Sequence, residues 1–248
     1  MNRLITLLLC IIFPAAGMAA EIKVLSAGAV SAAVKDIVTA FEKETGHSVK
    51  ITFAPVGVLQ GKLVAGEKAD VLILSDEAME PVGKVGPIVA ASRTKIGVVG
   101  IGVAVNEKAP LPDISTPEAF KQTLLRAKSI VYIDPTKGTS GKHFAGVLKE
   151  LGIEAEMKPK TLLLEGGYVV EPVGKGEIEL GVHQISEILP VKGVKLVGPL
   201  PAALQKNTIY VAAVMQSDAP QAAASEFVKY LVTPASRTVF LAKGFTAP

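Results

Sequence analysis

Segments typical of β-strands alternate with segments typical of α-helices along this chain, and this alternation constrains the fold more than any other feature. Residues 22–25 form a short apolar strand pattern, and apolar residues then recur at helical spacing over 30–41 until Gly46 ends the pattern. Further strand patterns follow at 49–53 and 69–74. Because parallel strands need long crossovers that are usually helical, the alternation predicts mostly parallel sheets with helices on both faces.

An apolar run punctuated by glycines, residues 96–105, is too long for one ordinary strand and too rich in glycine for a stable helix. We interpret it as a bent strand that crosses from one lobe to another. A second β-rich run at 207–215 brings the chain back before two helical segments at 219–231 and 235–241. Two crossings predict two lobes, lobe I formed by 21–98 with 207–248 and lobe II formed by 99–206.

The N-terminus has the pattern of a secretory signal peptide. A single cationic residue, Arg3, precedes the apolar run 4–13, which leads to a small-residue cleavage site at Ala19 or Ala20. The run is too short to span a bilayer, so we expect no membrane insertion once the first 20 residues are removed. Cys10, the one cysteine of the chain, would be lost with them. The sequence therefore predicts a cysteine-free protein located in a periplasm.

Composition argues against two classes of partner. Removal of Arg3 with the leader lowers the formal charge from +3 to +2, tryptophan is absent, and aromatic residues make up only 5% of the chain. Since nucleic-acid binders usually concentrate basic charge on one face, we expect no nucleic-acid partner. His47, His143 and His183 lie far apart without metal-ligand spacing, so we expect no metal and no cofactor.

The turns that follow strands are the places to look for a ligand, because ligands of open α/β sheets bind at the carboxyl ends of the strands, near helix N-termini. Small residues with two hydroxyls make up the first turn, 26–31, and the second turn spans 54–58. The third turn, 134–143, is the richest in donors and offers lysines that neutralise an anion. Its candidate ligand residues are Lys137, Thr139, Ser140, Gly141 and Lys142.

Competing interpretations of these residues are weaker. The third turn resembles a phosphate loop only in part, because Thr136 stands where the leading glycine is required and His143 replaces the hydroxyl that would hold Mg²⁺. Thr139 and Ser140 are also ordinary helix N-cap residues. No G-x-S-x-G elbow of a serine hydrolase is present. Strand alternation lets either His183 or Gln184 face the cleft and favours Gln184.

Taken in order, the segments resemble one family along nearly the whole mature chain: the periplasmic molybdate-binding proteins and their relatives, the class II solute-binding proteins of ABC transporters. The resemblance implies a two-lobed α/β fold, each lobe with a mostly parallel sheet flanked by helices, joined by two crossover strands. It also implies a small anionic ligand, a permease partner and a monomeric state. The matching segments are 24–27, 53–54, 69–76, 134–135, 140–141, 180–181 and 244–245.

The same resemblance implies where the ligand would bind. The family holds an oxyanion with hydroxyls, main-chain N–H groups and a tyrosine, and those positions fall on Ala29, Val56, Ser140, a residue near Gly166, and Gln184. Two hydroxyls and the tyrosine are therefore missing. Loss of a buried donor costs about 1–3 kcal/mol each, which argues against tight binding of molybdate or tungstate.

We therefore expect a periplasmic solute-binding protein that closes on a small oxygen-rich anion, an organic polycarboxylate rather than molybdate. The first alternative is an isomerase of an unsaturated tricarboxylate, because one branch of the family resembles a periplasmic aconitate isomerase. In that case Lys142, His143 and His183 are candidate bases, and the sequence does not choose among them. The second alternative is the molybdate- or tungstate-binding component of an ABC transporter. The predicted ligand-binding residues are Ser26, Gly28, Ala29, Ser31, Val56, Gly57, Lys137, Thr139, Ser140, Gly141, Lys142, Gly166 and Gln184.

Overall fold

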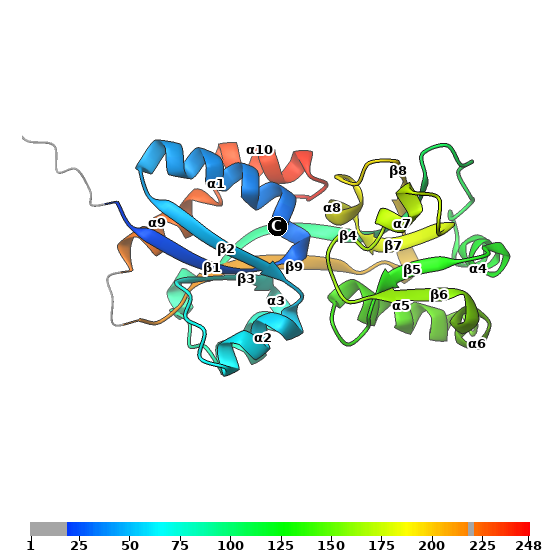
Figure 1. The fold of residues 1–248 in the computed structure, drawn as a ribbon, viewed down its shortest axis with the longest axis horizontal. Coiled ribbons are helices and arrows are strands. Elements are labelled where there is room, and N and C mark those ends of the chain that lie inside the picture. Colours follow the sequence, from blue (N-terminus) through cyan, green and yellow to red (C-terminus); the bar gives the residue numbers. More distant parts are fainter. Residues whose placement is uncertain (1–18, 218–220) are drawn as a thin grey trace, which may run out of the picture.

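The computed structural model describes residues 19–217 and 221–248, and within them the chain forms two lobes connected by long strands (Figure 1). The predicted leader and Cys10 lie outside the described residues, apart from Ala19 and Ala20. One nine-stranded sheet runs through both lobes in the order β2-β1-β3-β9-β4-β7-β5-β6, with β8 paired to β4. The strands are β1 (Glu21–Ala27), β2 (Ser48–Ala54), β3 (Val71–Ser75), β4 (Thr94–Asn106), β5 (Ile130–Ile133), β6 (Thr161–Leu164), β7 (Leu180–Gln184), β8 (Val194–Pro199) and β9 (Asn207–Val214).

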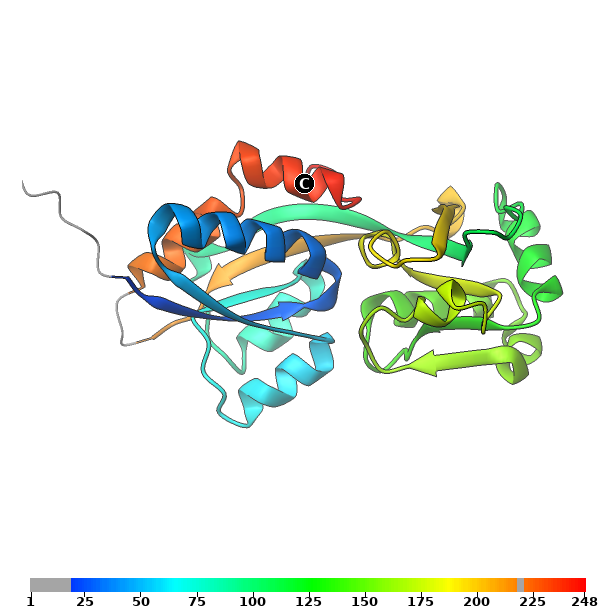
Figure 2. The same cartoon turned by 45° about the horizontal axis from the view of Figure 1, so that its top comes forward.

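Helices cover both faces of the sheet in each lobe (Figure 2). Short 3₁₀ turns, η1 (Gly28–Val30), η2 (Ala90–Ser92), η3 (Lys158–Lys160) and η4 (Ala202–Leu204), complete the elements. The helices are α1 (Ser31–Thr45), α2 (Val56–Val64), α3 (Asp76–Gly83), α4 (Pro117–Arg126), α5 (Thr139–Glu150), α6 (Glu154–Met157), α7 (Glu171–Gly174), α8 (Ile185–Ile188), α9 (Ala222–Tyr230) and α10 (Pro234–Ala242).

In lobe I, the strands β1, β2 and β3 are parallel, as the alternation predicts, and β9 runs antiparallel to β3. Helices α1, α9 and α10 lie on one face and α2 and α3 on the other (Figure 1). Phe41 of α1 packs edge-on against Phe227 and Tyr230 of α9, with ring centroids 5.1 and 5.2 Å away. The C-terminal helices therefore share the core of the first helix, although about 180 residues separate them in sequence.

In lobe II, β5 pairs in parallel with β6 and β7, and β4 runs antiparallel to β7 and β8. Two separate hydrophobic clusters cover the two faces of this sheet. One contains Phe120 and Phe144 from α4 and α5, and the other contains Val170 and Val173 from the segment around α7. The predicted fold class is therefore confirmed, with antiparallel pairing confined to contacts made by β4 and β9.

The long strand β4 passes from one lobe to the other. Its first part, residues 94–100, pairs with β9, and its second part, residues 101–106, pairs with β7 and β8. The glycines in this strand leave room for close neighbours: a Cβ on Gly97 would lie 2.9 Å from the Phe245 ring, and one on Gly102 would lie 2.8 Å from Ile185 and from Leu196. Side-chain crowding, rather than turn geometry, thus explains the glycine-punctuated run.

No helix between residues 19 and 217 or from 221 to 248 is long and apolar enough to cross a membrane.

Candidate functional site

A cavity of about 290 Å³ lies between the two lobes, at the carboxyl ends of β1, β2, β5 and β7. This is the position that the topology of open α/β sheets favours for a ligand. Both lobes contribute residues, and Tyr210 of β9 adds one from the connecting strand. The lining residues are Ala27, Gly28, Ala29, Ser31, Lys35, Phe53, Ala54, Pro55, Val56, Ile133, Gly138, Thr139, Ser140, Gly166, Gly167, Tyr168, His183, Gln184, Glu187 and Tyr210.

Three helix starts converge on this cavity. Gly28 and Ala29 open η1 and lead into α1, Val56 opens α2, and Thr139 and Ser140 open α5. The first N–H groups of a helix have no partner within the helix and carry partial positive charge, so these starts favour anionic groups. The cavity therefore offers main-chain donors from both lobes to a ligand with several negative groups.

Eight of the residues predicted from the sequence line the cavity, and five do not. Those that line it come from all the predicted turns and from the end of β7, which fits the principle that ligand contacts follow strands. The eight are Gly28, Ala29, Ser31, Val56, Thr139, Ser140, Gly166 and Gln184. The five that do not line this cavity are Ser26, Gly57, Lys137, Gly141 and Lys142, and their contact with a ligand stays a prediction.

Packing explains where two of these five residues lie. Ser26 points into the interior, fully buried, and its hydroxyl donates to the carbonyl of Ala27 at 3.2 Å. Gly141 packs against the carbonyl of Ile133, and a Cβ at this position would overlap that oxygen. A residue without a side chain is therefore needed at position 141 for the contact between α5 and β5, rather than for a ligand.

The other three lie on the outer parts of their turns. Gly57, the second residue of α2, is exposed, and so is Lys142 of α5. Lys137 belongs to a turn in which its own N–H donates to the carbonyl of Asp134 at 2.9 Å. The Asp134 carboxylate also accepts bonds from the hydroxyl and N–H of Thr136, which lower its pKa below the ordinary range. This turn thus satisfies its own polar groups instead of presenting them to the cavity.

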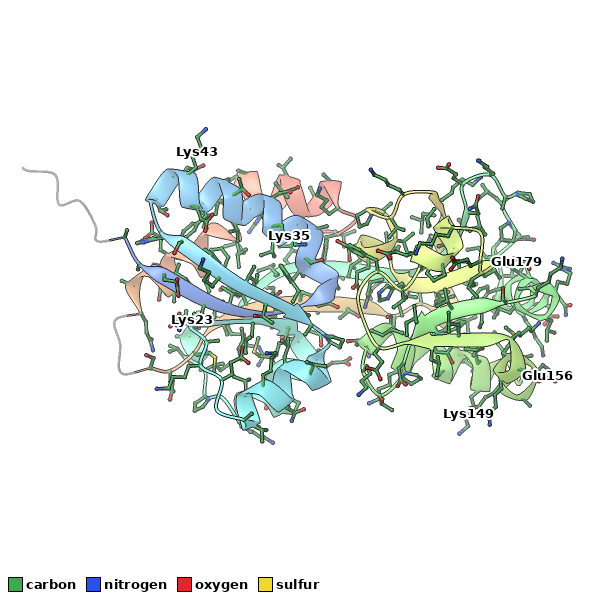
Figure 3. The ribbon with its side chains drawn as sticks, in the orientation of Figure 1. Lys23, Lys35, Lys43, Lys149, Glu156 and Glu179 are labelled. Carbon is green, nitrogen blue, oxygen red and sulfur yellow. The ribbon has the colours of Figure 1, made fainter. Side chains whose placement is uncertain are left out.

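The positive charge in the cavity comes from a different residue. Among the described residues, Lys35 is the one lysine or arginine that lines it. Its ammonium lies 5.5 Å from the centre of the Phe53 ring, a cation–π contact. Figure 3 marks Lys35 on α1, one helical turn after Ser31, whereas Lys43 and Lys149 stand at the outer rims of the lobes.

Across the cleft, a buried chain of polar contacts joins α5, β7 and α8. The hydroxyl of Ser140 lies 3.1 Å from Nδ1 of His183, and Nε2 of His183 lies 3.3 Å from Oε2 of Glu187. The same Nε2 lies 3.4 Å from the carbonyl of Gly167. Both ring nitrogens of His183 are therefore occupied.

Glu187 reaches towards lobe I. Its Oε1 lies 3.0 Å from the position that a Cβ on Gly28 would occupy, and the residue is only 7% exposed. Burial, followed by the charge of Glu187, raises the pKa of Tyr210 far above its ordinary value. The phenol of Tyr210 therefore stays protonated and is a hydrogen-bond donor to the cavity.

Two further polar groups reach the cavity, one at its floor and one at its rim. The amide nitrogen of Gln184 donates to Thr208 at 3.3 Å, while its Oε1 is buried without a partner among the described residues. At the rim, the hydroxyl of Tyr168 lies 3.4 Å from that of Ser31, which joins the two lobes. Both His183 and Gln184 line the cavity, so the alternation argument that favoured one of them is incomplete.

The candidate bases differ in placement. His183 lines the cavity, whereas His143 turns away and pairs through Nε2 with the carbonyl of Leu204 at 2.7 Å. Lys142 is exposed outside the cavity. Within the part of the chain that the structure describes, no group of three or more His, Cys, Asp or Glu side chains is arranged to hold a metal ion.

Sequence reasoning missed Lys35, Tyr168, Glu187 and Tyr210. Lys35 carries a usable signal, since it stands four residues after Ser31 and must share its helix face. Tyr168 follows the glycine pair Gly166–Gly167, a place of close backbone approach. Glu187 stands three residues after the end of β7, a place that the strand-end rule covers, whereas Tyr210 reaches the cavity only through the packing of β9 between the lobes.

Comparison with known proteins agrees with this architecture. The family model for bacterial extracellular solute-binding proteins matches residues 22–246. The chain is 32% identical over 216 residues to an aconitate isomerase of a Pseudomonas species, covering 85% of this chain and 81% of that protein. It is 29% identical over 253 aligned positions to the molybdate-binding protein of Azotobacter vinelandii, covering 99% and 97% of the two chains.

A solved structure shows the same fold. The periplasmic molybdate-binding protein of Azotobacter vinelandii superposes with a TM-score of 0.78 and 20% identity, covering 92% of this chain and 99% of the other. The match of the family model extends across both lobes and the cavity between them. This chain therefore belongs to the family of bacterial extracellular solute-binding proteins.

Proposed function

We propose that this protein is a periplasmic enzyme that binds a small unsaturated polycarboxylate between its lobes and moves a proton within it, so that the double bond shifts. One observation carries the proposal: the pair His183 and Glu187 is buried inside a cavity otherwise suited to anions. In a cleft that only held an anion, a buried carboxylate would oppose binding. In an enzyme that transfers a proton, a carboxylate and its imidazole partner form an acid–base group.

The remaining lining residues suit a ligand with several carboxylates. Helix starts at Gly28, Val56 and Thr139 provide main-chain donors, and Lys35 provides a cation. Phe53 and Val56 offer apolar surface to a carbon skeleton. A cavity of about 290 Å³ is near the lower limit of small-molecule sites, roughly 300 Å³.

A tetrahedral oxyanion such as molybdate has less support as the ligand of this cavity. The resemblance implies that molybdate-binding proteins use hydroxyls where this chain has Ala29 and Val56, and both residues line the cavity here. Neither side chain donates a hydrogen bond. The similarity to an aconitate isomerase, at 32% identity, adds support for an unsaturated tricarboxylate as substrate.

A receptor for an organic anion is the second candidate, and the arrangement of the lobes favours it. They are joined through β4 and β9, and the ligand cavity lies between them, so hinge closure would enclose the ligand. Such a receptor would deliver its ligand to an ABC-transporter permease. We propose the same organisation for both candidates, namely a monomer with residues 1–20 removed, lobe I at 21–98 with 207–248, and lobe II at 99–206.

The deciding experiment separates binding from conversion. The mature protein is incubated with cis-aconitate and, separately, with trans-aconitate, and proton NMR follows the appearance of the other isomer. Propane-1,2,3-tricarboxylate, which lacks the double bond, serves as a ligand that binds without reacting, and its binding is measured by thermal shift. We expect conversion of both isomers. Stabilisation by these tricarboxylates without any conversion would reject the enzyme in favour of the receptor.

A further inference from the structure

We propose that Glu187 is the catalytic acid–base residue of this site, that Ser140 and His183 are positioning residues for it, and that Gly28 of the opposite lobe leaves the space for its reactive oxygen. The proposal rests on the proton-transfer function proposed above. It goes further by assigning the proton to one atom, Oε1 of Glu187, and by making the site depend on both lobes.

The contacts of Glu187 and His183 give the two residues different roles. Both nitrogens of His183 have partners in the protein, Ser140 at 3.1 Å on one side and Glu187 at 3.3 Å on the other. The ring is 1% exposed, so it offers no free nitrogen to a substrate. Glu187 uses Oε2 towards His183, while its Oε1 has no hydrogen-bond partner among the described residues. Of the pair, Oε1 is thus the atom available to a substrate.

The position of Oε1 places it where a substrate would lie. It faces Gly28, the first residue of η1, from the opposite lobe. Gly28 and Glu187 line the same cavity, so the carbon skeleton of a substrate bound between the lobes would lie beside Oε1. A side chain on residue 28 would occupy this space, since even a Cβ would come within 3.0 Å of Oε1.

The other groups that could take a proton are arranged differently. Besides His183, the titratable residue that bears on Glu187 is Tyr210, whose phenol remains protonated and can donate to a substrate carboxylate. Tyr168 lies at the rim, next to Ser31. Lys35 stands on α1 as the cation of the cavity. Glu187 therefore supplies the one carboxyl group among the described residues that line the cavity.

The proposed reaction moves one proton from the substrate to Glu187 and back to another carbon of the substrate. Oε1 of Glu187 takes a proton from the methylene carbon of the substrate, so that a C–H bond breaks and an O–H bond forms. The electron pair spreads over the three allylic carbons and the conjugated carboxylate, where helix N–H groups and the Tyr210 hydroxyl stabilise it. Protonation of the far carbon from the glutamic acid then restores the carboxylate and leaves the double bond shifted by one position.

The first test replaces the carboxylate by a group of the same size. Glu187→Gln keeps an acceptor for His183 but removes the base, and we expect kcat to fall by about a hundred- to ten-thousandfold. Binding of propane-1,2,3-tricarboxylate, measured by calorimetry, should persist, which shows that the variant is folded. Glu187→Asp should recover part of the activity. Turnover by Glu187→Gln within tenfold of wild type would overturn the assignment.

The second test addresses the space at Gly28. Gly28→Ala should lower kcat at least tenfold because the methyl group displaces Oε1, and Gly28 has no positive φ that would strain an alanine. The matched control is Gly146→Ala on α5, where a Cβ meets no atom within 4 Å, and its kcat should equal that of wild type. Equal kcat for wild type and Gly28→Ala would reject the part assigned to Gly28.

The positioning role of His183 needs a readout that a structural role would not move. His183→Phe should lower kcat by about ten- to a hundredfold while binding of propane-1,2,3-tricarboxylate persists, because the carboxylate of Glu187 loses the imidazole that holds it in place. His183→Gln, which keeps a polar side chain at this position, should recover part of the loss. Wild-type kcat in His183→Phe would reject this role. The two proposals fail in different ways. No conversion by the wild-type protein rejects the proposed function and this assignment with it, whereas conversion by both wild type and Glu187→Gln rejects only the assignment.

Discussion

The hydroxyl of Tyr168 in lobe II lies 3.4 Å from the hydroxyl of Ser31 in lobe I. This contact closes one edge of the cavity that both side chains line. A second contact between distant parts of the chain, the ion pair of Lys206 with Glu77 at 2.8 Å, lies among exposed groups. Because exposed ion pairs contribute little, we expect the tyrosine–serine contact to hold the lobes together more than this ion pair does.

We expect Tyr168→Phe to weaken binding of propane-1,2,3-tricarboxylate by about two- to tenfold, since a neutral hydrogen bond contributes about 0.5–1.5 kcal/mol. Ser31→Ala should have a similar effect, and the double variant should lose no more than either single one. Calorimetry on the four proteins provides this comparison. Tyr230→Phe, on α9 and away from the cavity, serves as the control. Fully additive losses would show that the two hydroxyls act separately.

We expect Ser140→Ala to lower the stability of the folded protein, whether or not a ligand is bound. The hydroxyl of Ser140 is hydrogen-bonded to Nδ1 of His183, and its removal leaves a buried ring nitrogen unpaired. The expected loss is about 1–3 kcal/mol in the free energy of unfolding, measured by denaturant titration. Ser225→Ala on α9, a partly exposed position, should change it by less than about 0.5 kcal/mol. Equal stability of Ser140→Ala and wild type would contradict the hydrogen-bond chain.

The sequence predicts the fold well where patterns are local. The alternation of β1, α1, β2 and β3 is visible because β1 and β3 are largely buried and α1 has one apolar face. β6, with the sequence Thr-Leu-Leu-Leu, is not visible as a strand. It lies at the sheet edge with Leu162 and Leu163 exposed, so burial does not impose an alternating pattern on it.

The site is predictable only in part, for a related reason. Residues such as Ala29, Val56 and Ser140 follow strands directly, and strand ends meet at one edge of a sheet. The position of the third turn after a strand, together with its charge, predicts Lys137 and Lys142 as ligand residues, but neither lines the cavity. Tyr210 enters through tertiary packing of a connecting strand, which spacing in the sequence does not encode.

Lys160 gives a prediction about stability outside the site. Its ammonium donates to the carbonyls of Leu124, Leu125 and Ala127 at 3.2, 2.7 and 2.8 Å, at the C-terminal end of α4. Such bonds satisfy orphan carbonyls and complement the helix dipole. Lys160→Met should lower the unfolding free energy by about 2 kcal/mol, since a charged hydrogen bond contributes about 1.5–3 kcal/mol.

The corresponding fall in Tm is about 4–8 °C for a chain of this length, and it can be followed by circular dichroism. Lys158→Met is the matched control, because Lys158 is exposed two residues earlier and donates no side-chain bond of this kind. A fall of similar size in both variants would show that loss of a positive charge, rather than loss of the cap, is responsible.

Molybdate and tungstate at micromolar concentration should scarcely raise the Tm of the wild-type protein. Ala29 and Val56 supply no hydroxyl to the cavity. A ligand present at 100 times its dissociation constant would add about 2.7 kcal/mol of stability, so real binding would be plain in a thermal-shift assay. A clear upward shift of wild-type Tm with micromolar molybdate, and none with tricarboxylates, would instead establish an oxyanion receptor whose donors come from the main chain.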